Sequence, residues 1–183
     1  MNGLPVAAIL PAALPTAAAD RLATLFDTHH ERLYRLARRL VPTADDALDL
    51  VQETFLKVAR TPRSIPDGRA DEEAWLVRVL VNIRRDQWRR AAVRKRHSDE
   101  AKHSSAASAG GEAPLIAHAA IWSALDALPP RRRAVVVMHE LEELGVKDIA
   151  TLLGIAAVTV RWHLSRGRRA LASILKPHIG DHT

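Results

Sequence analysis

The chain contains no cysteine among its 183 residues. Disulfide frameworks, thiol nucleophiles and thiolate metal sites are therefore excluded, and the composition is compatible with a reducing compartment. No apolar run approaches the ~20 residues needed to cross a bilayer. Residues 1–19 are rich in Ala, Leu and Pro, lack the basic start of a signal peptide, and are interrupted by Pro5, Pro11 and Pro15. We expect a disordered tail there, and a soluble, cytoplasmic protein.

Signatures of enzymes are missing as well. The sequence has no Gly-rich phosphate loop and no nucleophile motif, and its 9 His residues are scattered over predicted helix faces and linker. We therefore expect no catalytic residue, no metal site and no cofactor. The chain does carry a formal net charge of +6, with its basic residues clustered. Such clustering indicates a polyanionic partner, without distinguishing DNA from RNA or an acidic membrane.

Apolar residues at helical spacing cover the first half of the chain. They predict helices over residues 20–40 and 44–60 and a long helix after a loop at residues 61–71, which holds Pro62, Pro66 and Gly68. Thr43 stands at a capping-box position before the second helix, and Asp71 is expected to cap the third. The predicted buried stripes of these two helices are Leu48, Val51, Phe55 and Val58, and Leu76, Val79, Leu80 and Ile83.

The second half begins after a Ser, Ala, Gly and His-rich stretch at residues 97–117, which predicts a flexible linker. A helix over 119–128 is separated by Pro129-Pro130 from another that ends near residue 142. The residues expected to point inward are Ile121, Leu125, Leu128, Ala134, Val135, Met138 and Leu141. No useful strand alternation occurs, so we expect an all-α fold of two small helical domains, divided into residues 1–19 (tail), 20–96, 97–117 (linker), 118–176 and 177–183 (tail).

Residues 146–171 have the pattern of a helix-turn-helix. Gly154 separates two short helical runs, and the second run has a buried stripe of Val160, Leu164, Gly167 and Leu171. Its opposite face is cationic and suits the major groove. An arginine-rich solvated helix is the alternative, but the Ala150/Gly154/Val160 spacing favours DNA contact. The candidate DNA-binding residues are Thr159, Arg161, Trp162, Ser165, Arg166 and Arg169.

The distal half of the long helix is also basic, and Trp88 lies among its arginines. Cationic side chains interleaved with an aromatic ring suit a single strand, because phosphates meet charge while a base stacks on the ring. The alternative is a solvated helix end with Trp88 packed in the core. The basic residues are Arg84, Arg85, Arg89, Arg90, Arg94, Lys95 and Arg96.

Several separated motifs in order resemble one family. They are Asp49 to Phe55, Ala74-Trp75-Leu76, Asn82, Asp86 to Arg90, and Ala127 to Arg131 ahead of the helix-turn-helix. The chain resembles a bacterial RNA polymerase sigma factor, and more narrowly the extracytoplasmic-function (ECF) group of the sigma-70 family. The resemblance covers roughly residues 22–175. That family has two helical domains on a flexible linker.

The resemblance implies roles for surfaces that would otherwise be read as solvated. Asp49, Gln52, Glu53 and Leu56 would dock on the clamp helices of core RNA polymerase, whose flap is a further expected contact. The segment from Ser64 to Arg90 would read the minus-ten promoter element, with a flipped base in a pocket at Ser64 to Glu73. The helix-turn-helix would read the minus-thirty-five element, and an anti-sigma factor is an expected partner. The residues expected along the unpaired strand are Asn82, Arg85, Trp88, Arg89 and Arg90.

Three departures from the family pattern limit what the resemblance carries. Gly145 and Val146 replace the usual Ser or Thr and aromatic residue, Trp162 and Ser165 are uncommon at recognition positions, and the loop at Ser64 to Glu73 is individual. The promoter sequence therefore stays open. The second domain alone would also fit a response-regulator output module, although such a regulator needs a receiver or ligand pocket that the first half lacks.

Overall fold

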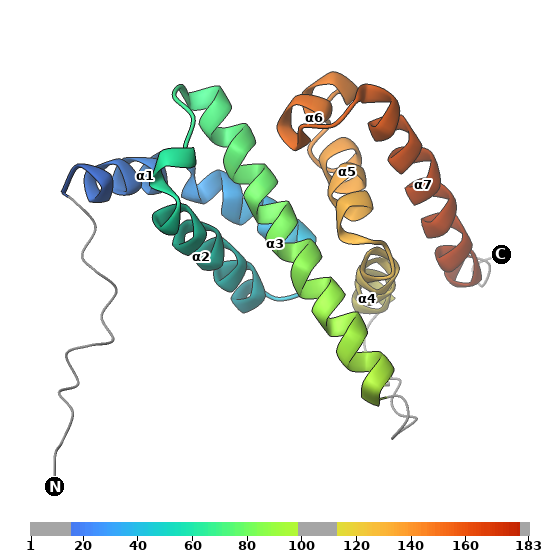
Figure 1. Ribbon diagram of the computed structural model, residues 1–183. Helices are drawn as coiled ribbons and strands as arrows, with labels where there is room; N and C mark the ends of the chain where they lie inside the picture. Colours follow the sequence, from blue (N-terminus) through green and yellow to red (C-terminus); the bar gives the residue numbers. More distant parts are fainter. Residues whose placement is uncertain (1–15, 99–112, 180–183) are drawn as a thin grey trace, which may run out of the picture.

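The computed structural model describes residues 16–98 and 113–179, which form seven α-helices and one short 3-10 helix. The all-α expectation is confirmed over these two stretches, which contain no strand. The elements are α1 (Thr16–Leu40), α2 (Ala44–Arg60), η2 (Pro62–Ser64), α3 (Arg69–Ser98), α4 (Ala113–Asp126), α5 (Pro130–Glu140), α6 (Val146–Leu153) and α7 (Ala157–Ile179) (Figure 1).

Local sequence signals set several of these boundaries as predicted. The Thr43 hydroxyl accepts a hydrogen bond of 3.0 Å from the backbone N–H of Asp46 and so caps α2. Pro130 occupies the first position of α5, where its missing N–H costs nothing. Gly154 ends α6 in the left-handed conformation, with φ 62° and ψ 43°, which glycine adopts without strain.

Three helices begin earlier than predicted, at Thr16, Arg69 and Ala113. Asp71 is therefore not a cap: Gly68, with φ 99°, makes the turn, and its carbonyl accepts from the N–H of Glu72 at 2.9 Å. The start of α4 falls inside the predicted linker because proline is tolerated in the first turn of a helix. The remaining predicted tail and linker segments, residues 1–15, 99–112 and 180–183, lie outside the described residues.

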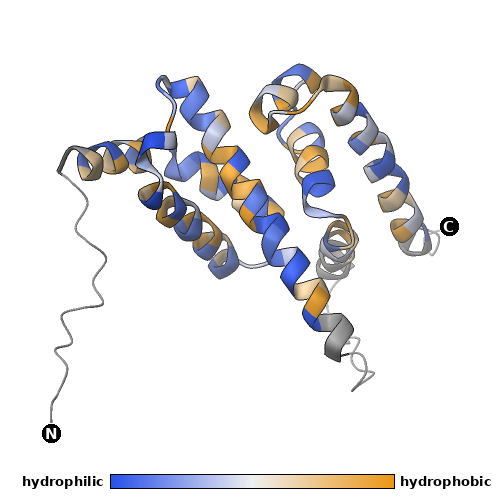
Figure 2. Cartoon of the chain, in the orientation of Figure 1, coloured by the Kyte–Doolittle hydropathy of each residue, from blue (hydrophilic) through white to orange (hydrophobic). Residues whose placement is uncertain are grey.

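The helices form two groups, α1–α3 and α4–α7, which pack against each other (Figure 1). Helix α3 contacts α5 and α6, α1 contacts α5, and buried residues of both groups belong to one continuous core. Figure 2 shows the apolar middle of α3 giving way to a mainly hydrophilic distal part. Polar contacts also join the groups. Arg78 donates to the carbonyl of Thr151 at 3.2 Å, and Arg84 lies 4.0 Å from Asp126. Arg32 and Arg39 pair with Glu142 at 2.7 Å and 3.2 Å.

The predicted buried stripes are mostly confirmed, with three errors. Leu48, Ile121 and Leu141 were expected inside but are 54%, 50% and 52% exposed, and Val79 is only half-buried. The expectation favoured large apolar residues, whereas α2 and α4 bury the small Ala47 and Ala124. Leu141 follows the last residue of α5, where the chain turns away from the core. The residues buried as predicted are Val51, Phe55, Val58, Leu76, Leu80, Ile83, Leu125, Leu128, Ala134, Val135 and Met138.

Candidate nucleic-acid interface

A short turn sets α7 against α6. The N–H of Ile155 donates to the carbonyl of Ala150 at 3.0 Å, which closes the turn around Gly154. Gly145 occupies the cap position of α6 without a side-chain hydrogen bond. The two helices thus form the predicted helix-turn-helix, and α7 extends well beyond it to Ile179.

Helix α7 separates an apolar back from a cationic front. Val160, Leu164 and Gly167 are buried, whereas Leu171 is partly exposed. The Arg169 guanidinium donates to the Ser165 hydroxyl at 3.1 Å. A helix with this division packs on the domain through one face and leaves the other for a polyanion. The structure exposes five of the six candidate residues, Arg161, Trp162, Ser165, Arg166 and Arg169, and leaves Thr159 half-buried.

The arginine run at the start of α5 divides into different roles. Arg133 is buried, pairs with Asp126 and lies over the ring of Trp122 at 5.1 Å from its centroid. Burial lowers the pKa of Arg133, and the carboxylate of Asp126 opposes that change. Arg132 lies 5.4 Å from the ring centroid of Trp162 on α7. The run therefore braces the domain and the recognition helix, and the second contact was missed from the sequence.

The candidate single-strand residues on α3 do not all share a face. Asn82, Arg85 and Arg89 recur at intervals of three and four residues and so form a strip along the helix, which we call the minus-ten candidate strip. Arg85 lies 3.5 Å from the carboxylate of Asp86. Trp88 is half-buried on another side of the helix, where it lines a hollow together with Val41, Pro42 and Arg84. The geometry thus keeps both interpretations of Trp88 open, because the residue is only half-buried.

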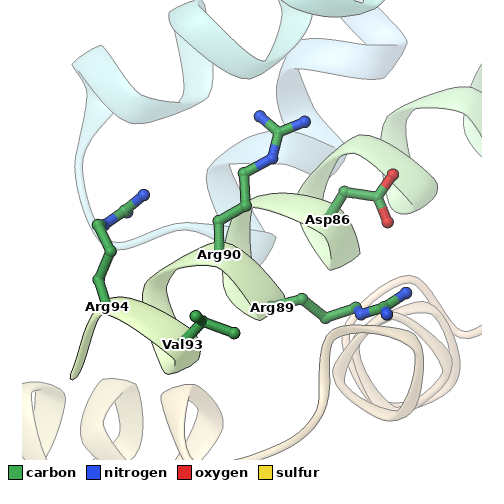
Figure 3. A pocket seen from close by; sticks show the side chains of 5 residues that line it. All are labelled: Asp86, Arg89, Arg90, Val93 and Arg94. Atoms are coloured by element: carbon green, nitrogen blue, oxygen red, sulfur yellow. The ribbon is translucent and has the colours of Figure 1, made fainter. Parts of the chain in front are cut away.

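Distal to this strip, three arginines surround an open hollow. Arg89, Arg90 and Arg94 line it together with Asp86 and Val93, and Figure 3 shows their guanidinium groups spread around the helix. Within the described part of the chain, none of these three arginines makes an ion pair. Exposed guanidinium groups without carboxylate partners are suited to phosphate contact.

Arg78 extends the strip on α3 in the direction of the second group of helices. It lies four residues before Asn82, donates to the carbonyl of Thr151, and packs over Gly154 so that an added Cβ would sit 3.1 Å from its Cδ. No local sequence pattern signals this contact, because the partner lies 73 positions away. The minus-ten candidate strip therefore borders the helix-turn-helix turn.

The candidate polymerase-docking residues lie on the outer face of α2. Asp49, Gln52, Glu53 and Leu56 are all exposed, and Leu56 is 56% exposed. Glu53 accepts a hydrogen bond of 2.8 Å from the side-chain amide of Gln87 on α3. An apolar side chain on an acidic surface is a feature of protein contact sites.

An apolar groove beside this face was not predicted. Phe26, Tyr34, Leu48 and Val51 line it, and the rings of Phe26 and His30 stack with centroids 4.7 Å apart. The error over Leu48 explains the omission, since a residue assigned to the core cannot contribute to a surface. The hydrophobic groups of α1 and α2 thus continue the candidate docking face.

Two further features of the described residues concern metal binding and membrane spans. Among the described side chains, no three His, Cys, Asp or Glu residues are grouped to hold a metal ion. Of the described helices, none combines the length and the apolar character of a membrane span.

The two halves of the chain match two parts of one family. Residues 25–94 match "Sigma-70 region 2", and residues 118–171 match "Sigma-70, region 4". The ECF RNA polymerase sigma factor SigM of Mycobacterium tuberculosis H37Rv is 35% identical over 160 residues, covering 86% of this chain and 80% of that protein. SigE of Mycolicibacterium smegmatis is 34% identical over 158 residues, covering 84% of this chain. The chain spans only 61% of the length of that SigE.

Solved structures agree on the fold. The sigma factor RpoE from Bartonella quintana, crystallised with the anti-sigma factor NepR, is similar with a TM-score of 0.57 and 25% identity, covering 88% of this chain and 98% of that one. CnrH, solved with the cytosolic domain of CnrY, gives the same TM-score at 24% identity over 88% and 93% of the two chains. The order of two matched regions also favours a sigma factor over a response-regulator output module. The chain belongs to the extracytoplasmic-function sigma factors of the sigma-70 family.

Proposed function

We propose that this sigma factor directs core RNA polymerase, in the cytoplasm, to specific promoters and opens the DNA there. One observation carries the proposal. The chain exposes two cationic helix faces, on α3 and α7, and a separate acidic and apolar face on α2. Two DNA-binding faces and one protein-binding face are what a promoter-specificity subunit needs.

The front of α7 reads the minus-thirty-five element in the major groove. Arginine can pair bidentately with the O6 and N7 atoms of guanine, and each good pair contributes about 1–3 kcal/mol of discrimination. Arg161→Ala or Arg166→Ala should therefore weaken selection at one base pair. Loss spread equally over all sequences would indicate a phosphate contact instead.

The strip on α3 holds the opened minus-ten strand. Unpairing and extruding a base costs a few kcal/mol, and contacts available only to the single strand offset that cost. Asn82 and Arg85 supply polar groups at the middle of α3, and Arg89, Arg90 and Arg94 supply positive charge beyond them. Melting thus follows from differential binding and requires no covalent chemistry.

The outer face of α2 docks on the clamp helices of the polymerase. Asp49→Lys or Glu53→Lys should abolish sigma-dependent transcription while leaving helicity unchanged, because both side chains are exposed. Asp27→Lys, an exposed position on α1, is the matched control for charge reversal. Polymerase binding that survives both reversals on α2 contradicts the docking assignment.

The free protein should bind promoters poorly, because each domain contributes little alone. Polymerase fixes the spacing of the two DNA-binding faces, so that they act together through effective concentration. In the free protein, the contact of Arg78 with Thr151 holds the helix-turn-helix against the cationic strip of α3. This arrangement differs from one in which the two DNA-binding faces span a promoter. An anti-sigma factor, as in the RpoE complex with NepR, would act on the same equilibrium.

The decisive experiment is transcription in vitro with bacterial core polymerase on a pool of random promoters. We expect transcripts that depend on this protein and share minus-ten and minus-thirty-five sequences. Absence of any selected sequence would refute the proposal, and a gel shift with the free protein measures how much of the selection requires polymerase.

A further inference from the structure

Trp162 is a large apolar residue on a mainly cationic face. Its side chain is 49% exposed, whereas its exposed neighbours on the front of α7 are Arg161, Ser165 and Arg166. An indole that is half in solvent presents apolar surface to whatever covers this face. The ring, together with Val158 one turn earlier, which is 68% exposed, adds apolar surface to a face that is otherwise suited to charge and hydrogen bonding.

The ring is held in place from α5 and from its own helix. The guanidinium carbons of Arg132 and Arg166 lie 5.4 Å and 5.9 Å from its centroid, and the ring of His163 meets it edge-on at 4.9 Å. Both arginines are at cation–π distance. The Nε atom of Arg132 is buried and has no hydrogen-bond partner among the described residues. The position of the Arg132 side chain is thus set by packing and by its contact with the Trp162 ring.

Gly167 brings the two helices close enough for this contact. A Cβ added there would lie 2.4 Å from Cγ2 of Val136 and 3.4 Å from Cγ of Arg132. Helix α7 therefore crosses α5 at a separation that only glycine permits without adjustment. The close crossing carries the stem of Arg132 to the side of Trp162.

A thymine carries the apolar group that such a ring can recognise. In the major groove the four base pairs present hydrogen-bonding groups, and the 5-methyl of thymine is the distinctive apolar one. We propose that Trp162 contacts the 5-methyl group of one thymine in the minus-thirty-five element, and that Arg132 is the positioning residue that orients the ring. The inference rests on the proposed function, in which α7 enters the major groove.

Other uses of the ring predict different behaviour. Packing on deoxyribose or phosphate gives no preference for any base. A hydrogen bond from the indole N–H can go to acceptors on several bases, and it survives removal of a methyl group. Only methyl contact makes binding sensitive to thymine against uracil, which differ by that single group.

The test uses the holoenzyme and changes the DNA, so that protein folding is not in question. Promoters are first selected by the wild-type holoenzyme, and each thymine of the minus-thirty-five element is then replaced singly by deoxyuracil. We expect open-complex formation to fall about fourfold at one position, the effect of one buried methyl group. Trp162→Ala should abolish that difference, and Arg161→Ala should retain it.

Arg132→Ala tests the positioning role through the same ratio. It should bring the thymine-to-uracil ratio at that position towards one, while Arg131→Ala, which removes an equal charge from the preceding position, should keep the fourfold value. A merely structural role for Arg132 would lower binding to both templates equally. The circular dichroism of each variant checks that helicity is retained.

Three results would overturn the inference: a selected element without thymine, no position sensitive to uracil, or equal sensitivity in Trp162→Ala. These results leave the proposed function standing, because promoters were selected. Failure of the wild-type holoenzyme to select any promoter refutes the proposed function itself. The two failures are thus separated by the first step.

Discussion

Helices α3 and α7 are both long and arginine-rich, with 30 and 23 residues, but they are buried on different numbers of sides. On α3, Leu80 lies on the side of Gln87, which donates to Glu53 of α2. Val81 lies on the side of Arg84, which contacts Asp126 of α4 at 4.0 Å. Both Leu80 and Val81 are buried, so α3 is enclosed from two directions.

Helix α7 buries a single stripe of residues against the helices of its own group. Val160, Leu164 and Gly167 are buried, and the arginines opposite them lie in solvent. On α3, by contrast, Arg78 and Arg84 are used in holding the two groups of helices together. The positive charge of a helix therefore indicates a nucleic-acid contact only when the basic residues that bind other parts of the protein are left out of the count.

The largest expected effect tests the enclosure of α3. Leu80→Ala removes a fully buried side chain and should lower the free energy of unfolding by about 2–5 kcal/mol. Val93→Ala, at an exposed position of the same helix, should change it by less than about 0.5 kcal/mol. Urea unfolding followed by circular dichroism measures both. Equal values for the two variants would mean that the middle of α3 is not buried.

The contact between the two groups should depend on a nearly buried carboxylate. Glu142, whose side chain is 7% exposed, accepts from Arg32 at 2.7 Å and 3.2 Å and lies 3.2 Å from Arg39. Removing one partner of a buried pair costs about 3–5 kcal/mol, but both arginines are partly exposed. We therefore expect about 2 kcal/mol of destabilisation for Glu142→Ala.

Glu140→Ala is the matched control for this pair. Glu140 also lies 2.7 Å from an arginine, Arg168, but both of those side chains are exposed. Its removal should cost less than about 1 kcal/mol because water replaces the contact. If Glu142→Ala costs no more than Glu140→Ala, this carboxylate does not hold α1 to the turn that follows α5.

Sequence reasoning found the features that depend on neighbouring residues. The Thr43 cap, the break at Gly154 and the buried back of α7 each follow from a few adjacent positions. The contacts of Arg32 with Glu142 and of Arg78 with Thr151 join residues 110 and 73 positions apart, which no local pattern encodes. The second buried side of α3 was missed for the same reason.

The candidate site divides in the same way. The exposed front of α7 and the outer face of α2 lie where helical spacing placed them, whereas the arrangement around Trp162 depends on Arg132 of another helix. Spacing can assign a residue to a face. Spacing cannot show which other helix packs beside that face, and so the contact of Arg132 with the ring of Trp162 was not predicted.

A smaller effect is expected at the turn between α5 and α6. Glu143 has φ 55°, a left-handed conformation that costs a non-glycine residue about 1–2 kcal/mol. Glycine avoids this strain but loses more backbone entropy on folding, by about 0.5–1 kcal/mol. Glu143→Gly should therefore stabilise the protein by about 0.5–1 kcal/mol. Glu143→Ala, which keeps the strain, should give no such gain in thermal unfolding.

The smallest effect concerns His163, beside the cationic front of α7. Burial, with the charges of Arg132 and Arg131, holds the pKa of His163 below its usual value. The unfolded chain then takes up the proton first, so stability should be lost as the pH falls below about 6.5. His163→Gln should lose less stability than wild type between about pH 7.5 and about pH 5.5 in urea unfolding. The loss in Arg131→Gln should lie between those of the other two proteins, because this variant removes only one of the three causes of the lowered pKa. Equal losses in all three proteins would show that His163 does not contribute to the pH dependence of stability.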